Sequence, residues 1–163
     1  MVSVPGLTDG GKVTSRLVEF VDVFPTLVEA AGLPSVSQCP HTSDESRKIN
    51  SCTEGTSFMP LVRDPNLLWK SASFSQYPRM TNSADLIMGY SIRTDQYRYT
   101  EWLLFNIYTL KPRDVIIARE LYDHSIDPNE NVNMADKWKY QEIIKGLHKQ
   151  LSGGWPAALP KSF

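Results

Sequence analysis

The chain has 163 residues, of which 41% are hydrophobic and 21% charged, and its formal net charge is −1. This composition fits one domain, or the end of one domain followed by a small second one, and argues against a wholly disordered chain. Basic residues do not cluster as nucleic-acid binding requires, and no apolar run approaches the roughly 18 residues of a membrane span.

The first residues, Val2–Val4, read as the end of a strand that leaves through Pro5-Gly6. No basic segment is followed by an apolar one, so the N-terminus does not have the pattern of a signal peptide. Because the chain opens on a strand end, we expect it to be part of a longer protein.

A short strand is expected over Arg16–Val21, followed by a helix over Val23–Ala31. Asp22 is placed to cap the helix N-terminus, and Gly32 to end it. One face of the helix is apolar and is expected to pack on a sheet. It would stay exposed if a larger body were missing. That face consists of Phe24, Leu27, Val28 and Ala31.

A polar connector occupies residues 35–70, and its apolar island Phe58–Val62 is expected to form a helical turn. It holds the two cysteines of the chain, Cys39 and Cys52. Their spacing is compatible with two reduced thiols or with a disulfide. Neither cysteine lies in a C-x-x-C motif, and His41 alone does not complete a zinc site.

The last section predicts an antiparallel sheet. Extended runs cover Ser73–Tyr77 and Met88–Thr94, and Tyr97–Phe105 folds back across the turn at residues 95–96. Glu120–Asp123 adds another strand. The intervening stretch Asn106–Arg119 reads as an insertion whose tip has a role of its own.

A closing helix is expected over Lys137–Leu151, ended by Gly153-Gly154. One helix packed on an antiparallel sheet makes this section α+β. The apolar face of the helix comprises Tyr140, Ile143, Ile144, Leu147 and Leu151. The Pro-rich tail that follows has no evident partner.

Several short segments of the sequence resemble those of a known protein family. They are VDVFPTLVEAAGLP (21–34), SQYPR (75–79), MGYSIRT (88–94), YRYT (97–100) and ELYDHSIDPNE (120–130). Together they resemble the C-terminal portion of sulfatases in the alkaline-phosphatase-like superfamily. Within that superfamily, their sequences resemble those of iduronate-2-sulfatases. The resemblance implies that residues 1–66 end the large α/β subdomain and its connector, and that residues 67–163 form the small C-terminal subdomain. It also implies a disulfide between Cys39 and Cys52.

The implied parent reaction is hydrolysis of the 2-O-sulfate of a uronate in heparan or dermatan sulfate, in a lysosomal or secreted enzyme. Members of the family use calcium and a formylglycine made from the cysteine of a C-x-P-S-R motif. Neither cysteine here has that context, and Asp64-Pro65-Asn66 and Asp127-Pro128-Asn129 read as turns. We therefore expect no catalytic or metal-binding residue in this chain, and an upstream catalytic portion as its partner. The alternatives are a non-catalytic binding or stabilising module and a sulfatase of other specificity.

Gln76, Tyr77 and Arg79 are the candidate substrate-binding residues, because an anionic sugar calls for Arg with aromatic and amide neighbours. The alternative is that Tyr77 packs and Arg79 pairs with a carboxylate. Arg93 and Arg98 are expected to be stacked or ion-paired within the sheet.

The remaining candidates have structural interpretations. His124 could be an acid–base group, but it is expected to be structural at the entry to a turn. His148 is expected to be solvated on the closing helix. The four tryptophans, Trp69, Trp102, Trp138 and Trp155, are expected to build the core and subdomain contacts rather than a binding platform.

Overall fold

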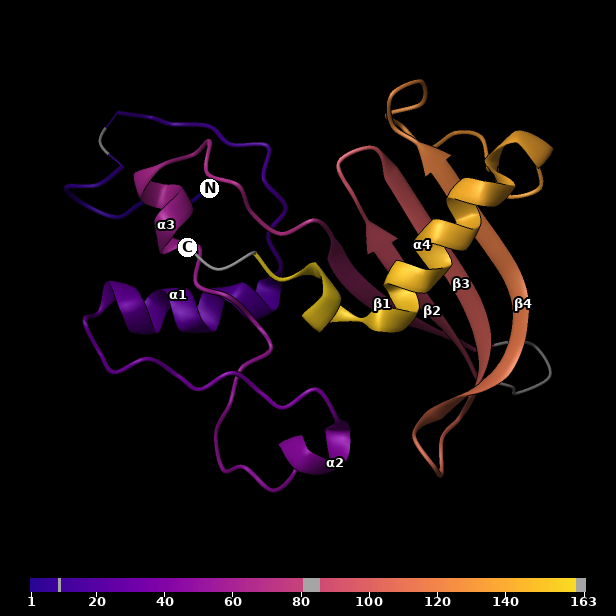
Figure 1. Cartoon of the computed structure of the whole chain (residues 1–163), viewed down its shortest axis with the longest axis horizontal. Helices are drawn as coiled ribbons and strands as arrows, with labels where there is room; N and C mark the ends of the chain where they lie inside the picture. Colours follow the sequence, from indigo (N-terminus) through magenta and orange to yellow (C-terminus); the bar gives the residue numbers. More distant parts are fainter. Residues whose placement is uncertain (9, 81–85, 161–163) are drawn as a thin grey trace. The chain divides into compact units, whose positions relative to one another are not determined.

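A computed structural model describes residues 1–8, 10–80 and 86–160 of the chain. It divides into two compact units, Met1–Ser71 with the residues from Leu159 onward, and Ala72–Ala158 (Figure 1). The first unit holds η1 (Phe20–Asp22), α1 (Val23–Ala30), α2 (Ser43–Ser46) and α3 (Met59–Arg63). The second holds β1 (Ser73–Met80), β2 (Leu86–Arg93), β3 (Tyr97–Asn106), β4 (Lys111–Asp123), η2 (Trp138–Tyr140), α4 (Gln141–Gly153) and η3 (Trp155–Ala158).

Helix α1 confirms the predicted helix and its stop signal. Gly32 has φ +67°, a conformation that glycine adopts without strain, and it ends the helix. The Leu33 N–H then donates to the Val28 carbonyl at 3.1 Å, which satisfies one of the last free carbonyls of the helix. The expected turn near residue 60 is also present, as α3.

The connector is closed by a disulfide between Cys39 and Cys52, as the family resemblance implied. An isolated bridge joins Gln38 to Thr53 beside it, and the Cys39 N–H donates to the Thr53 carbonyl at 2.9 Å. In the chain-entropy account, a loop of this size contributes roughly 3 kcal/mol by restricting the unfolded chain.

Two predicted strands of the first unit were wrong. Val2–Val4 and Arg16–Val21 are not strands, since in the part of the chain that the structure describes neither has a neighbouring strand to pair with. The Arg16 guanidinium and the Thr14 hydroxyl instead donate to the backbone carbonyls of Asn66 and Pro65, at 2.9 and 2.7 Å. The segment around Thr14 and Arg16 is extended because these two side chains hydrogen-bond to the loop at residues 65–66.

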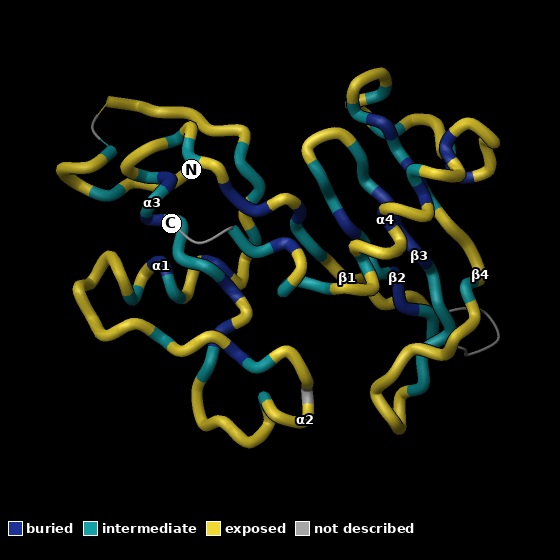
Figure 2. Tube along the Cα trace, in the orientation of Figure 1, coloured by how far each residue is buried: buried dark blue, intermediate teal, exposed yellow. Residues whose placement is uncertain are grey.

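The apolar face of α1 does not pack on a sheet. Phe24 is 51% and Leu27 63% exposed, and Phe20 in the preceding turn is 97% exposed. Figure 2 shows how little of α1 is buried. The prediction that this face packs on a sheet was therefore wrong for this chain, in which the face is largely exposed.

The second unit is a four-stranded antiparallel sheet in the order β1-β2-β3-β4. Its register aligns four apolar residues across the strands, namely Phe74, Ile92, Tyr99 and Leu121. Helix α4 lies across the sheet on their side (Figure 1), and Ile144 and Leu147 join Ile92, Tyr99 and Leu121 in one buried cluster. This confirms the predicted antiparallel sheet with one packed C-terminal helix.

The stretch Asn106–Arg119 is not an insertion outside the sheet. It completes the β3–β4 hairpin and supplies most of β4. Pro112 is tolerated because β4 is an edge strand, where a missing N–H need not break a ladder. The tail was also misjudged, since Trp155–Ala158 forms η3 and Ala158 enters the core.

Across the described ranges, we find no helix with the length and apolar character that crossing a membrane demands.

Candidate functional site

The indole ring of Trp102 lies on Gly89 of the neighbouring strand. The two residues are paired in the β2–β3 ladder, and a Cβ placed on Gly89 would come within 2.7 Å of a ring carbon. Only glycine leaves room for the ring at this position. We define the Trp102 face as the sheet side opposite α4, with Tyr77, Arg79, Gly89, Trp102 and Glu120.

Trp102 holds two polar side chains in place on this face. The Arg79 guanidinium carbon lies 4.9 Å from the ring centroid, a cation–π distance. The indole N–H donates to Glu120 Oε1 at 2.9 Å. Arg79, Trp102 and Glu120 together line a hollow of about 190 Å³, which is closed by Ile87, Ile117 and Ala118. The hollow thus combines a cation, an acceptor carboxylate and apolar walls.

Glu120 also takes part in a second set of polar contacts. The Tyr122 hydroxyl donates to its Oε2 at 3.4 Å, and the Arg98 guanidinium stacks over the Tyr122 ring at 5.2 Å. Arg98 forms an ion pair with Glu130, and His124 Nε2 lies 2.7 Å from the other oxygen of Glu130. Arg98 is therefore stacked and ion-paired, as predicted, and His124 has the structural setting expected for it.

The three predicted substrate-binding residues do not share one face. Successive strand residues point to opposite sides, and Tyr77 aligns with Gly89 whereas Gln76 aligns with Tyr90 in the β1–β2 register. Gln76 therefore lies on the α4 side of the sheet. Tyr77, which is 66% exposed, and Arg79 lie on the Trp102 face. No described carboxylate pairs with Arg79, which contacts the Trp102 ring instead.

Arg93 closes the turn between β2 and β3. Its Nη1 donates to the Thr94 carbonyl and, at 3.4 Å, to the Tyr97 carbonyl. Burial lowers the pKa of Arg93, while the charges of Glu130 and Asp95 raise it. Arg93 is therefore structural, as expected, but within the described residues it hydrogen-bonds to backbone carbonyls rather than stacking on a ring or forming an ion pair.

On the α4 side, Glu101 is buried and receives two partners. The Tyr99 hydroxyl donates to Glu101 Oε1 at 2.6 Å, and His148 Nδ1 lies 2.6 Å from the same atom. Burial, followed by this hydrogen bond, raises the pKa of Tyr99, so the phenol keeps its proton. The His148 side chain is 51% exposed, as expected of a solvated residue, and its ring also joins α4 to the sheet.

The tryptophans differ in their surroundings. Trp69 is buried, as expected of a core residue, whereas Trp138 is 88% exposed. Trp102 is half-buried and forms the floor of a hollow, which the sequence did not predict. The interpretation of all four as core or contact residues was therefore too broad.

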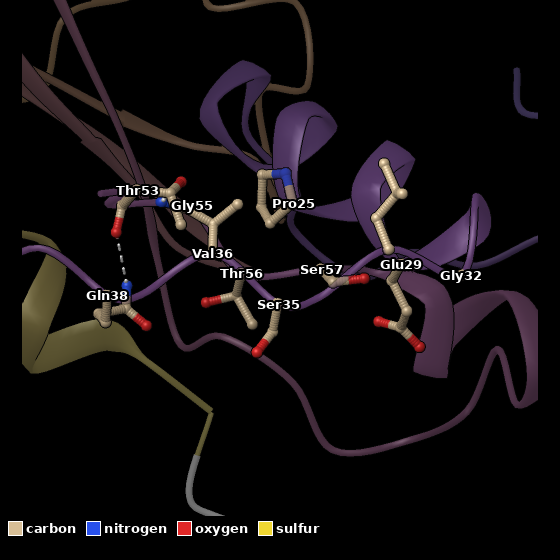
Figure 3. A pocket seen from close by; sticks show the side chains of 11 residues that line it. Pro25, Glu29, Gly32, Ser35, Val36, Gln38, Thr53, Gly55, Thr56 and Ser57 are labelled. Atoms are coloured by element: carbon tan, nitrogen blue, oxygen red, sulfur yellow. Dashed lines mark hydrogen bonds between the residues drawn. The ribbon is translucent and has the colours of Figure 1, made fainter. Parts of the chain in front are cut away.

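The first unit has a larger hollow of about 500 Å³ (Figure 3). Small polar side chains line its middle, Gln38 donates to the Thr53 carbonyl at one end, and Glu29 lies at the other. Glu29 is the charged residue of this lining, and it pairs with Arg63 at 3.1 Å. The lining offers no cation for a sulfated or carboxylated ligand, so we place the candidate site on the Trp102 face.

The carboxylates in the described part of the chain do not gather as ligands of a calcium ion. Asp22 and Glu19 pair with Lys70 at 2.6 and 2.7 Å, and Asp127 accepts from Asn131 and the Val132 N–H. Within residues 1–8, 10–80 and 86–160, no three His, Cys, Asp or Glu side chains gather as metal ligands would.

Comparisons with known proteins decide the family of this chain. The family described as "N-sulphoglucosamine sulphohydrolase, C-terminal" matches residues 1–154. The chain belongs to this sulfatase C-terminal family. Iduronate 2-sulfatase of Homo sapiens is 37% identical over 153 residues, covering 81% of this chain and 27% of that protein. Iduronate 2-sulfatase of Mus musculus is 33% identical over 160 residues, covering 85% and 28%.

A solved structure of this sulfatase fold supports the architecture. BT4656, in complex with its substrate D-glucosamine-2-N,6-O-disulfate, matches with a TM-score of 0.56 at 22% identity, over 83% of this chain and 23% of that one. The sulfatase C-terminal chain thus spans about a quarter of the length of the relatives that it matches.

Proposed function

We propose that this chain is the C-terminal part of an iduronate-2-sulfatase-like sulfuric ester hydrolase, which removes the 2-O-sulfate from a uronate of heparan or dermatan sulfate. The observation that carries the proposal is the 37% identity to human iduronate 2-sulfatase over 153 residues. The nucleophilic formylglycine and the calcium ion would be held by the upstream part of such an enzyme, in a lysosome or outside the cell.

In this proposal the upstream catalytic portion is the partner of the chain. The exposed apolar residues of η1 and α1 support this, since Phe20, Phe24 and Leu27 lie together in sequence and each exposes half or more of its surface. Apolar patches of this kind mark protein contacts. The chain would hold the catalytic portion and present Tyr77 and Arg79 to the sugar from the Trp102 face, and Gln76, on the α4 side, would not take part.

A second specificity has its own support. The family description names N-sulphoglucosamine sulphohydrolase, and BT4656 binds a glucosamine disulfate. A sulfatase that acts on sulfated glucosamine is therefore the competing candidate, and it differs from the first in the sugar that is hydrolysed.

A chimera tests the proposal. Residues 1–163 would replace the corresponding C-terminal part of human iduronate 2-sulfatase, and hydrolysis of a 2-O-sulfated iduronate would be compared with that of an N-sulfated glucosamine. We expect the chimera to retain activity on the iduronate substrate. A folded chimera, verified by its melting curve, that prefers the glucosamine substrate or hydrolyses neither would contradict the proposal.

A further inference from the structure

The turn that follows α2 carries two adjacent basic residues, Arg47 and Lys48. Nowhere else in the sequence do Lys or Arg occupy neighbouring positions. Both residues are exposed, and the Arg47 side chain keeps 70% of its surface in solvent. Its ion-pair partner Asp44, at 3.9 Å, is 82% exposed, so this pair holds Arg47 only weakly. Proteases with a carboxylate in their specificity pocket, as in trypsin, bind Lys and Arg side chains that are presented in this way.

The loop around this turn is held together by local hydrogen bonds. The backbone N–H groups of Ser46, Lys48 and Ile49 donate to carbonyls three or four residues earlier in the chain, at 3.0–3.1 Å. The Thr42 hydroxyl donates to Glu45, also within the loop, at 2.7 Å. Figure 2 shows that most of the loop around α2 is exposed. A peptide bond must leave its turn to enter a protease, and a segment with few buried contacts opens at little cost in free energy.

The base of the loop is fixed more firmly than its tip. The disulfide between Cys39 and Cys52 closes it. Beside the disulfide, the Cys39 N–H donates to the Thr53 carbonyl at 2.9 Å, and the Thr53 N–H donates to the Ser37 carbonyl at 3.0 Å. Opening of residues 42–49 therefore stops at a covalent link and need not spread into the rest of the first unit. After a cut within the loop, the same link keeps the two pieces together.

Basic residues elsewhere are engaged in contacts that a protease would have to break. Lys12 Nζ donates to the Arg63 carbonyl at 3.2 Å, and the Arg16 guanidinium donates to the Asn66 carbonyl at 2.9 Å. Arg98 lies in β3, where its backbone is part of the ladders with β2 and β4. Cleavage beside Arg98 would require the sheet to open. The turn after α2 is thus the most favourable of these positions.

We infer that the Arg47-Lys48 turn is a cleavage site for a serine protease of basic specificity, and that the cleaved chain remains one folded, disulfide-linked molecule. Hydrolysis consumes one water and breaks the Arg47–Lys48 or the Lys48–Ile49 peptide bond. It leaves a carboxylate on one new end and an ammonium group on the other. The inference goes beyond the proposed function and does not depend on it, because it involves neither a sugar nor a sulfate ester.

Brief digestion of the native 163-residue chain with trypsin tests the inference. We expect the first cut, located by mass spectrometry, after residue 47 or 48. The product should migrate near the intact mass of 18.4 kDa without reductant and separate into two pieces after reduction. Resistance to trypsin, or a first cut at another position, would overturn the assignment of the site. Pieces that separate without reductant, or a cut chain that no longer melts cooperatively, would overturn the claim that the product stays joined and folded.

Two variants compare the turn with the rest of the chain. In Arg47→Gln/Lys48→Gln the intact chain should disappear about tenfold more slowly or less than in the parent, because every remaining site must open from a less accessible structure. Lys12→Gln, which removes a basic residue from another loop, should change the rate by less than about twofold. If the double variant disappeared as fast as the parent, other sites would be equally accessible, and the turn would have no special role.

The dependence of the cleavage rate on urea tests whether a local opening suffices. A local opening exposes little surface, so the rate on the native chain should rise by less than about twofold up to about 1 M urea. The rate on casein, an unfolded substrate, corrects for any effect of urea on trypsin. A rise in parallel with global unfolding would show that the loop is cut only when the whole unit opens, and would contradict the inference.

Discussion

Lys70 Nζ lies 2.6 Å from Asp22 Oδ1, although the two residues are 48 positions apart in the sequence. Both side chains are buried, with exposed fractions of 3% and 0%. Lys70 also reaches Glu19 at 2.7 Å, and the Thr56 N–H donates to Asp22 at 2.7 Å. This buried cluster ties the end of the connector to the start of α1.

Replacing Lys70 should destabilise the first unit strongly. Lys70→Met leaves the carboxylates of Asp22 and Glu19 without their cation, and loss of one partner of a buried pair costs about 3–5 kcal/mol of unfolding free energy. Arg63→Met is the matched control, because it breaks an ion pair with Glu29 that is 55% and 38% exposed and should cost about 1 kcal/mol or less. Urea unfolding of both variants measures the difference. Equal losses of unfolding free energy in the two variants would show that the buried cluster contributes no more than an exposed ion pair.

A methyl group at Gly89 should disturb the Trp102 face. Gly89→Ala would place a Cβ 2.7 Å from the Trp102 ring, and relieving such an overlap typically costs about 1–3 kcal/mol. The tryptophan fluorescence should change as the ring moves. Gly146→Ala is the control, since a Cβ at this position of α4 meets nothing within 4 Å and should stabilise the helix by about 0.5–1 kcal/mol. A Gly89→Ala protein with unchanged melting and fluorescence would argue against the described packing.

Arg93→Ala should lower stability more than it changes sugar selectivity in a complete enzyme. Its guanidinium donates to the Thr94 and Tyr97 carbonyls at the β2–β3 turn and contributes no side chain to the Trp102 hollow. Loss of hydrogen bonds from a charged donor costs about 1.5–3 kcal/mol. Melting temperatures and the ratio of kcat/KM for two sulfated sugars would be compared between Arg93→Ala and the parent. Normal stability with altered selectivity would refute this assignment.

Protonation of Asp123 at low pH should make the second unit less stable. Burial acts to raise the pKa of Asp123, but hydrogen bonds from Ser125, Gln96 and Tyr140 outweigh it and hold the pKa below the ordinary value of an aspartate. A depressed folded-state pKa contributes stability that is present above the unfolded pKa and is lost as the pH falls through the folded one.

The measurement for Asp123 is the unfolding free energy, followed from neutral pH down to pH values below the ordinary pKa of an aspartate. Asp123→Asn should reduce the loss of stability on acidification, whereas Asp136→Asn, at an exposed position, should leave it unchanged. If the Asp123→Asn protein lost as much stability in acid as the parent, another group would be responsible.

Local patterns predicted much of the second unit. The alternation in Met88–Thr94 and the fold-back at residues 95–96 correspond to β2, its turn and β3, and the apolar face of the last helix is the face that packs. The length of β4 was underestimated because Pro112 and the charges around it are typical of a loop and are also tolerated at a sheet edge.

The candidate site on the Trp102 face was harder to predict from the sequence, because it depends on contacts between strands. Alternation alone could have separated Gln76 from Tyr77 and Arg79. The position of Trp102 over Gly89 depends on the β2–β3 register, which sequence spacing does not fix.

The role of Asp22 was missed for the same reason. The sequence indicated a cap for the helix that follows it, whereas its side chain accepts from the Glu19 N–H at the start of η1 and binds the distant Lys70. A partner 48 positions away leaves no local pattern from which it could be predicted.

Complementation of a split enzyme tests most directly the proposal that this chain supports a sulfatase whose catalytic residues lie upstream. The upstream part of human iduronate 2-sulfatase would be expressed without its C-terminal part and mixed with the 163-residue chain, and hydrolysis of a 2-O-sulfated iduronate would be measured. We predict activity from the mixture and none from the chain alone. Hydrolysis by the purified chain alone would contradict the claim.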